Sequence, residues 1–377
     1  MKKELKFAAS AIGAAPFAAT ALFKSALRAL EAKPPPGEVS CEPIVLMHGF
    51  AGFRELGPLD WVWFEYFSNV RRQLGAMGYQ VFAPQVAPFD DPLDRAQQYF
   101  SAIEKIRDDT GADKVHLVGH SQGGLDARVL AAPFKDPHET PIGPLFGLGY
   151  GAHVASVTTI ATPHFGSVIA DAVMKEIPGH EQAVDALMWS LDLITALVRG
   201  EQQDTDRAVT ALTRKFMLEH FNPIIEDDPN VRYYAIAGDP GNLKVVHPWL
   251  RPEYRDLLET DPAAGGGPND GLVTVNSSLF GNPPPGSEAQ DLPELKPHRR
   301  KNWEPLGVLE ADHIAEVGLE LRAKRPNTYD HLAFFAGLAQ FLDNAYTAEM
   351  TLRKDGQWER VPKSRAMPAP VAVVGSP

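Results

Sequence analysis

Residues 115–132 read VHLVGHSQGGLDARVLAA, and this segment joins a strand pattern, a turn motif and a helix pattern. An apolar run typical of a buried strand (115–118) leads into Gly-His-Ser-Gln-Gly at 119–123, and helix-forming residues follow from Leu125. A Gly-x-Ser-x-Gly sequence between a strand and a helix is typical of the nucleophile elbow, a strained turn that exposes a serine at the end of a strand. We therefore expect Ser121 to act as a nucleophile.

The two glycines of this motif, Gly119 and Gly123, have a steric explanation. A Cβ atom at either position would clash with the neighbouring strand or helix, so the turn needs residues that lack one. The turn also places the backbone N–H of Gln122 at the N-terminus of the following helix, where it can help to hold an oxyanion. The competing interpretation is a chance turn rich in glycine and serine, which the flanking strand and helix disfavour.

Length and composition set the class of protein. With 377 residues, 44% of them hydrophobic and 22% charged, the chain can bury a full core and is expected to form one large domain with insertions. A net charge of −12 without a basic run argues against a nucleic-acid partner. The single cysteine, Cys41, has no partner for an internal disulfide and leaves the cellular compartment open. No run of about 18 strongly apolar residues predicts a membrane-spanning helix.

Residues 1–40 are expected to precede the folded domain, and two interpretations of them stay open. Two lysines precede the alanine-rich run FAASAIGAAPFAATALF (7–23), in which Ala-Thr-Ala at 19–21 fits a cleavage site, as in a signal peptide. Apolar residues near helical spacing also fit an amphipathic helix that ends at the proline run 34–36. A signal peptide implies a secreted or periplasmic protein, and a retained helix implies a cytoplasmic or membrane-associated one.

Residues 41–346 are predicted to form an α/β domain, because short apolar or β-branched runs alternate with segments of helical pattern. Strands are expected at 44–47, 79–83, 115–118, 154–160 and 231–237, and helices at 61–77, 96–109 and 329–346. Such alternation predicts a mostly parallel central sheet with helices on both faces.

The first strand ends in His48-Gly49-Phe50. In hydrolases that carry a nucleophile elbow, the loop after an early central strand supplies the second oxyanion N–H. We expect Phe50 to be that donor and His48 to fix the loop by hydrogen bonds. His153 and His164 are also interpreted as structural, because no pair of carboxylates lies near them at the spacing of a metal site.

Four segments in this order resemble a known family: PIVLMHGFAGF (43–53), VHLVGHSQGG (115–124), VTTIATPHFGS (157–167) and PNDGLV (268–273). They are similar to the true lipases, the secreted bacterial triacylglycerol lipases of the α/β-hydrolase fold. The resemblance extends over roughly residues 43–345. It implies that the chain has this fold and hydrolyses esters at a lipid–water interface.

The triad of this fold follows the chain order Ser, Asp or Glu, His. Asp239 and Asp261 fit that order, but Asp270 matches the family segment that carries the triad aspartate. Its alternative interpretation is an Asx turn before Gly271. Both His313 and His331 follow Asp270, and the resemblance favours His313 as the base.

The resemblance also implies a lid in the interval from about 171 to 222. Apolar residues recur there at helical spacing, namely at Ala183, Leu187, Leu191, Ile194 and Val198. A lid would cover an apolar acyl cleft in water and open at a lipid surface, although a helix packed on the sheet has the same periodicity. A proline-rich insertion at about 282–303 is expected to be a surface loop, and 347–377 a loosely ordered tail.

True lipases usually bind a structural calcium ion near the histidine loop, with an aspartate two residues after the triad histidine. That position is Ala315 here, and 245–248 reads Val-Val-His-Pro. Because calcium needs six to eight oxygen ligands, we predict no calcium site of the family type, no other metal and no cofactor.

The expected function is therefore a carboxylic-ester hydrolase, a triacylglycerol lipase with Ser121, Asp270 and His313 as triad. One alternative is a short-chain carboxylesterase or an acyltransferase that uses the same triad. Another is a non-catalytic binding protein with the α/β-hydrolase fold.

Overall fold

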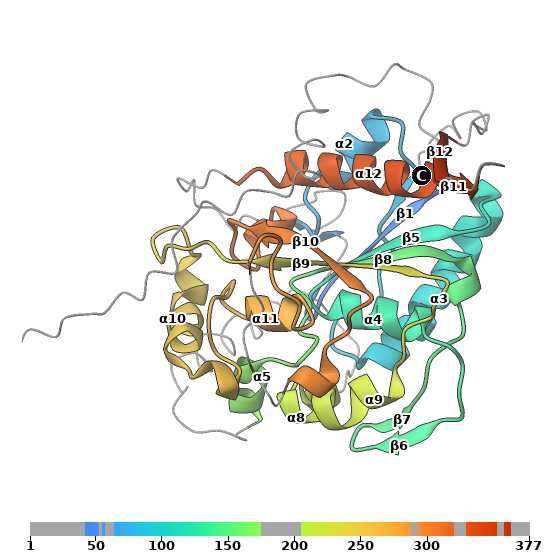
Figure 1. Cartoon of the computed structure of the whole chain (residues 1–377). Coiled ribbons are helices and arrows are strands. Elements are labelled where there is room, and N and C mark those ends of the chain that lie inside the picture. Colours follow the sequence, from blue (N-terminus) through green and yellow to red (C-terminus); the bar gives the residue numbers. More distant parts are fainter. Residues whose placement is uncertain are drawn as a thin grey trace, which may run out of the picture.

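The central element is a six-stranded parallel sheet with the strand order β10-β9-β8-β5-β1-β4 (Figure 1). The computed structural model describes residues 42–52, 55–56, 64–174, 205–287, 292, 295–319, 329–352 and 358–362. The strands are β1 (Ile44–Met47), β4 (Val81–Phe82), β5 (Val115–His120), β8 (Val154–Ile160), β9 (Arg232–Gly238) and β10 (Trp303–Leu309). The predicted sheet is confirmed.

Burial explains why the central strands read as continuous apolar runs. Every residue of β1, β5 and β8 is buried. A parallel sheet covered on both faces leaves no side of a strand in water, so strict alternation of polar and apolar residues is lost.

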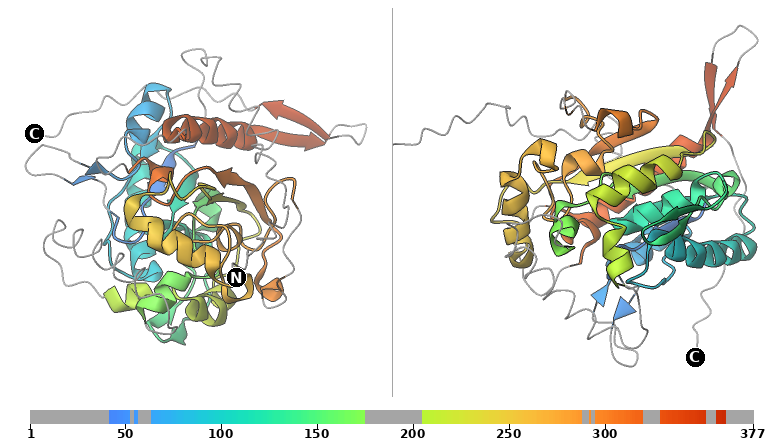
Figure 2. Two further views of the ribbon diagram at one scale, coloured as in Figure 1. Left: turned by 90° about the vertical axis from the view of Figure 1, so that its left-hand side faces the viewer. Right: turned by 90° about the horizontal axis from the view of Figure 1, so that it is seen from below.

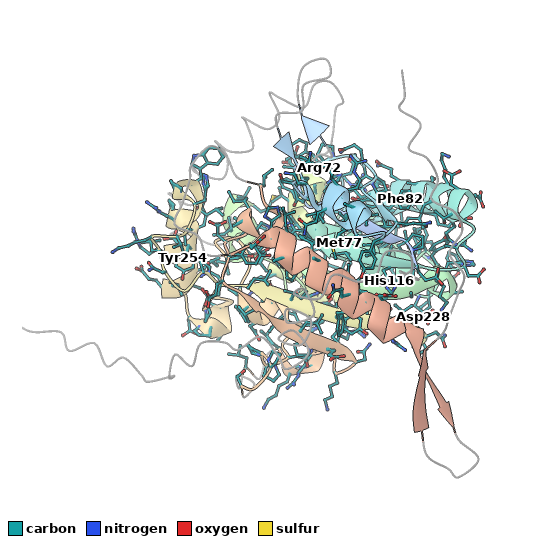
Figure 3. All side chains as sticks on the ribbon, turned by 90° about the horizontal axis from the view of Figure 1, so that it is seen from above. Arg72, Met77, Phe82, His116, Asp228 and Tyr254 are labelled. Carbon is teal, nitrogen blue, oxygen red and sulfur yellow. The ribbon has the colours of Figure 1, made fainter. Side chains whose placement is uncertain are left out.

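Helices cover both faces of the sheet (Figures 1 and 2). Helices α3 (Pro92–Thr110) and α4 (Gln122–Ala131) pack on one face, and α2 (Val70–Ala76) and α12 (His331–Thr347) pack on the other. Met77, labelled in Figure 3 at the end of α2, packs against the core that α12 also forms. This arrangement is that of an α/β-hydrolase.

The N-terminus of α3 follows directly from its sequence. Asp91 caps the helix by accepting hydrogen bonds from the N–H groups of Leu93 and Asp94, and Pro92 occupies the first helical position. The helix ends at Gly111, whose φ of 67° favours glycine.

The remaining elements are short. The strands are β2 (Glu55–Leu56), β3 (Phe64–Glu65), β6 (His138–Thr140), β7 (Gly143–Leu145), β11 (Ala348–Leu352) and β12 (Trp358–Pro362). The helices are α5 (Val168–Val173), α7 (Thr205–Thr210), α8 (Arg214–Phe216), α9 (Asn222–Ile224), α10 (Arg251–Glu259) and α11 (Val275–Ser278). Single turns are η1 (Gly151–His153), η2 (Met217–Phe221), η3 (Pro248–Leu250), η4 (Pro262–Ala264), η5 (Lys296–His298) and η6 (Ala315–Val317).

The structure differs from the sequence prediction in the segment 61–77. The helix begins only at Val70, because Phe67 and Asn69 have φ values of 54° and 57°, which no α-helix accepts. Before this break, β3 pairs antiparallel with β2. The helix predicted at 61–77 is therefore shorter than expected, and its observed bounds are Val70–Ala76.

Two other segments are more ordered than expected. In the proline-rich insertion, Leu295 and Trp303 are buried, so part of it packs against the core. In the tail, β11 and β12 form an antiparallel pair beyond α12 (Figure 2). The predicted lid helix at 183–198 lies outside the described residues. None of the helices that the structure describes is both long and apolar enough to cross a membrane.

Candidate active site

Ser121 stands in the turn between β5 and α4, with φ 55° and ψ −128°. A positive φ is strained for a residue with a side chain, so the surrounding bonds must hold it. Its N–H donates to Ile160 O at 2.9 Å, and Thr162 Oγ1 donates to Ser121 O at 2.8 Å. The strand next to β5 therefore fixes the turn.

Close backbone contacts surround the two glycines of the elbow. A Cβ on Gly119 would lie 2.4 Å from Gly123 O, and a Cβ on Gly123 would lie 2.2 Å from Met47 O. Either atom would push α4 away from the sheet, since a backbone oxygen cannot move aside as a flexible side chain can. The turn is possible only without side chains at these two positions.

Asp270 and His313 form a buried pair. His313 Nδ1 lies 2.8 Å from Asp270 Oδ2, and the two side chains are 7% and 0% exposed. Asp270 Oδ1 accepts hydrogen bonds from the N–H groups of Leu272 and Val273, both at 2.8 Å. One carboxylate oxygen is thus fixed by the backbone, which leaves the other to orient the imidazole.

The alternative histidine and aspartates are engaged elsewhere. His331 Nε2 donates to Ser68 O at 2.9 Å, at the start of α12. Asp239 Oδ1 accepts from Gly241 N and from the hydroxyl of Tyr254, and Asp261 caps the turn η4. Of the sequence candidates, the structure brings together Ser121, Asp270 and His313.

Ser121 and His313 line the same pocket, which has a volume of about 180 Å³. Its remaining wall is mostly apolar. It includes Phe50, Ile169, Val209, Leu212, Leu272, Val273, Ile314 and Val317. Ser121 and the histidine of the buried Asp–His pair thus line one mostly apolar pocket, where a hydrocarbon chain can leave water.

The loop after β1 contributes Phe50 to this pocket. Its neighbours Ala51 and Gly52 donate their N–H groups to Pro88 O and Gly49 O, whereas the N–H of Phe50 has no acceptor among the described residues. Gln122 is the first residue of α4, and its side chain donates to Asp90 O at 2.7 Å. These are the two expected oxyanion donors.

His48 holds this loop, as expected. Its Nδ1 lies 3.0 Å from Gly49 O, and its Nε2 accepts the N–H of Val86 at 3.3 Å. Burial lowers the pKa of His48 to about 3, so the ring stays neutral.

Sequence reasoning missed a buried chain of hydrogen bonds behind the site. The Tyr66 hydroxyl accepts the N–H of Gly49 at 3.1 Å and lies 2.6 Å from His120 Nδ1. His120 Nε2 lies 2.9 Å from Glu316 Oε2. Burial lowers the pKa of His120 well below its ordinary value and raises that of Glu316 well above its own, so burial favours the neutral form of both groups. The chain joins the oxyanion loop, the elbow and the histidine loop.

Two members of this chain bear on a metal site. Within the described ranges, the one group of His and acidic side chains with metal-ligand spacing is His120, His313 and Glu316. His120 and Glu316 are already bonded to each other, and His313 is bonded to Asp270 through Nδ1. We assign these groups to hydrogen bonding.

The residues near the histidine loop do not fit the calcium site of the family. Ala315 offers no side-chain oxygen, and Asp312 is used internally: Oδ2 accepts the N–H of His247 at 2.6 Å and Oδ1 that of Ala315 at 2.9 Å. Burial raises the pKa of Asp312 to about 6. One carboxyl group thus links two loops by direct hydrogen bonds to the backbone.

His164 is structural, as predicted from its sequence context. Its ring stacks on Phe280 at 4.4 Å, and its Nε2 lies 3.1 Å from Thr159 Oγ1. The buried guanidinium of Arg128 lies over the rings of Phe280 and Phe221 at 4.7 and 4.9 Å. His153 Nδ1 lies 3.3 Å from Asp113 O, and its ring packs against Tyr150 with 5.0 Å between the ring centroids.

The chain is similar in sequence to known lipases. The family described as "Lipase-like, C-terminal domain" matches residues 104–199. The triacylglycerol lipase of Vibrio cholerae is 30% identical over 263 residues, which cover 63% of this chain and 74% of that protein. The triacylglycerol lipase of Pseudomonas fragi is 32% identical over 161 residues, or 42% of this chain and 48% of that protein.

A solved structure is similar in fold. The Staphylococcus hyicus lipase superposes with a TM-score of 0.57 and 20% identity, over 84% of this chain and 98% of that one. At this identity the likeness concerns the fold alone.

Proposed function

The chain belongs to the bacterial triacylglycerol lipase family and is a lipase-type serine ester hydrolase, and we propose that it cleaves acylglycerols with Ser121, His313 and Asp270 as its triad. The observation that carries the proposal is the buried His313–Asp270 pair at the pocket of Ser121. The backbone N–H groups of Phe50 and Gln122 complete the proposed site.

In the first half of the reaction, Ser121 Oγ attacks the ester carbonyl carbon, and His313 Nε2 takes the hydroxyl proton. Asp270 holds the other ring nitrogen and stabilises the imidazolium. The oxyanion accepts hydrogen bonds from Phe50 and Gln122, and each such donor contributes about 10²–10³ to the rate. The C–O bond then breaks, and the alcohol leaves with the proton from His313.

In the second half, His313 takes a proton from water, whose oxygen attacks the acyl-enzyme carbonyl. Collapse of the second tetrahedral intermediate returns the proton to Ser121 and releases the fatty acid. The apolar pocket supports this substrate class, because it offers a hydrocarbon chain a dry surface. Action at a lipid–water interface under a lid at 171–222 stays a prediction.

The test compares hydrolysis of triolein with that of a soluble butyrate ester. The parent chain should release acid from triolein, and Ser121→Ala should lower this rate by about 10⁴–10⁶-fold because the nucleophile is gone. A normal thermal unfolding curve for the variant is the control. Retained activity in a folded Ser121→Ala variant would refute the mechanism, and activity on the butyrate ester alone would favour an esterase.

A further inference from the structure

One acidic side chain, Glu253, stands in the otherwise mostly apolar wall of the pocket that Ser121 lines. Glu253 is the third residue of α10, the helix that Tyr254 marks in Figure 3. The helix dipole favours an acid in a first turn, but such an acid normally stays in water. Glu253 is instead only 1% exposed.

The protein compensates the burial of Glu253 only in part, by a hydrogen bond from the backbone N–H of Glu253 itself. Its Oε2 atom is shielded from solvent and has no hydrogen-bond partner, and within the part of the chain that the structure describes no Lys or Arg forms an ion pair with it. The N-cap residue of α10, Leu250, has no side chain that could share a capping box with it. A buried carboxyl oxygen without a partner is costly, so a role in packing alone does not explain this residue.

The charge state of Glu253 fits an apolar wall. Burial raises the pKa of Glu253 to about 8, and the nearby carboxylate of Asp256 acts in the same direction. The group is therefore a neutral carboxylic acid near pH 7. In this form it can donate a hydrogen bond, and it does not repel a hydrocarbon chain as an anion would.

We infer that Glu253 is a specificity-determining residue that hydrogen-bonds an oxygen atom of the substrate away from the scissile ester bond. The inference rests on the proposed ester hydrolase function and deepens it by naming the substrate class. The oxygen is either the carbonyl of a second ester group, as in an acylglycerol, or a hydroxyl group on the acyl chain. A plain monoester leaves the acid unpaired, so the enzyme prefers substrates that carry the additional oxygen.

The experiment measures kcat/KM of the full chain on two matched pairs of esters. The first pair is propane-1,2-diol dibutyrate and propyl butyrate, and the second is methyl 12-hydroxystearate and methyl stearate. Glu253→Leu removes the donor, and Glu253→Gln keeps one in nearly the same volume. Glu259→Leu, at an exposed acid of the same helix, is the matched control.

The parent should prefer the oxygen-rich member of one pair, and that pair identifies the source of the oxygen. Glu253→Leu should lose about tenfold of this preference, which is the usual effect of one missing hydrogen bond to a buried group. Glu253→Gln should keep most of the preference, and Glu259→Leu all of it. If Glu253→Leu does not fold, Glu253→Ala supplies the same comparison.

Two results overturn the inference: a parent without preference in either pair, or an equal change by Glu253→Leu on both members of each pair. Both leave the hydrolase function intact. A parent chain that hydrolyses none of the four esters would instead refute the proposed function, and the inference with it.

Discussion

At the scale of single residues, the contact of Asp270 with His313 supports the proposal that His313 is the base. A carboxylate can orient only an imidazole that it touches, and Asp270 Oδ2 touches His313 at 2.8 Å, whereas His331 is bonded to the backbone of Ser68. We predict that His313→Ala lowers kcat by about 10⁴–10⁶-fold. His331→Ala should lose no more than a few-fold. Steady-state kinetics on a soluble ester compares the two, and the reverse order of effects would make His331 the base.

Tyr66 is expected to act through another group, because its hydroxyl accepts the N–H of Gly49, next to the proposed oxyanion donor Phe50. Removal of that hydroxyl frees the loop after β1 without removing any reacting atom. We predict that Tyr66→Phe lowers kcat about tenfold and leaves KM within a factor of about two, since the oxyanion forms only in the transition state. An equal rise in KM at unchanged kcat would assign Tyr66 to substrate binding instead.

At the scale of elements, the close approach of α4 to β1 depends on Gly123. A Cβ there meets the carbonyl oxygens of Met47 and His48 at 2.2 and 2.7 Å. We predict that Gly123→Ala lowers the free energy of unfolding by about 1–3 kcal/mol, the usual cost of overpacking, and lowers activity as well. Thermal or urea unfolding measures the change.

Gly75 is the matched control, because a Cβ at this position in α2 meets nothing within 4 Å. Gly75→Ala should therefore be neutral or raise the free energy of unfolding by up to about 1 kcal/mol, as alanine generally does in a helix. If both variants lose equal stability, the contact of Gly123 with β1 is not the cause.

At the scale of the whole molecule, the parts that the sequence predicts are those with local causes. The strands β1, β5 and β8 are short buried runs between turns, and the elbow carries two glycines within five consecutive residues, so one segment is enough to recognise each of them. The contacts that require Gly123 nevertheless come from the end of β1. Residues far apart in the sequence were not predictable in this way. Tyr66, His120 and Glu316 bond across separations of 54 and 196 residues, and no periodicity records such a partnership.

Burial also depends on residues that are far apart in the sequence, and it shifts the pKa of acidic side chains such as Glu253. Glu253 lies in the first turn of α10, where an acid normally stays in water, yet the fold covers it. The break before α2 also arises from backbone angles at Phe67 and Asn69 that helical spacing does not report. The spacing of apolar residues thus predicts which face of a helix is buried. It does not predict where the helix begins or which polar side chains are buried with that face.

Because burial raises the pKa of Glu253, the contribution of this residue to stability should fall as the pH rises. The pKa of Glu253 is raised from 4.5 to about 8 by burial, so the folded state retains a proton that the unfolded state releases between these values. The stabilising contribution is therefore complete below pH 4.5 and is lost as the pH rises to about 8. Glu253→Gln, which does not titrate, should have this contribution at every pH.

We predict that the difference in melting temperature between Glu253→Gln and the parent is near zero at pH 4.5 and favours the variant at pH 8. Differential scanning calorimetry at the two pH values measures it, and each pair is compared at one pH so that other titrating groups cancel. Glu259→Gln, at an exposed position, should show no such difference. If the variant is no more stable than the parent at pH 8, Glu253 is ionised in the folded parent. A rise in pH favours the unfolded parent only when the folded parent keeps a proton that the unfolded chain releases.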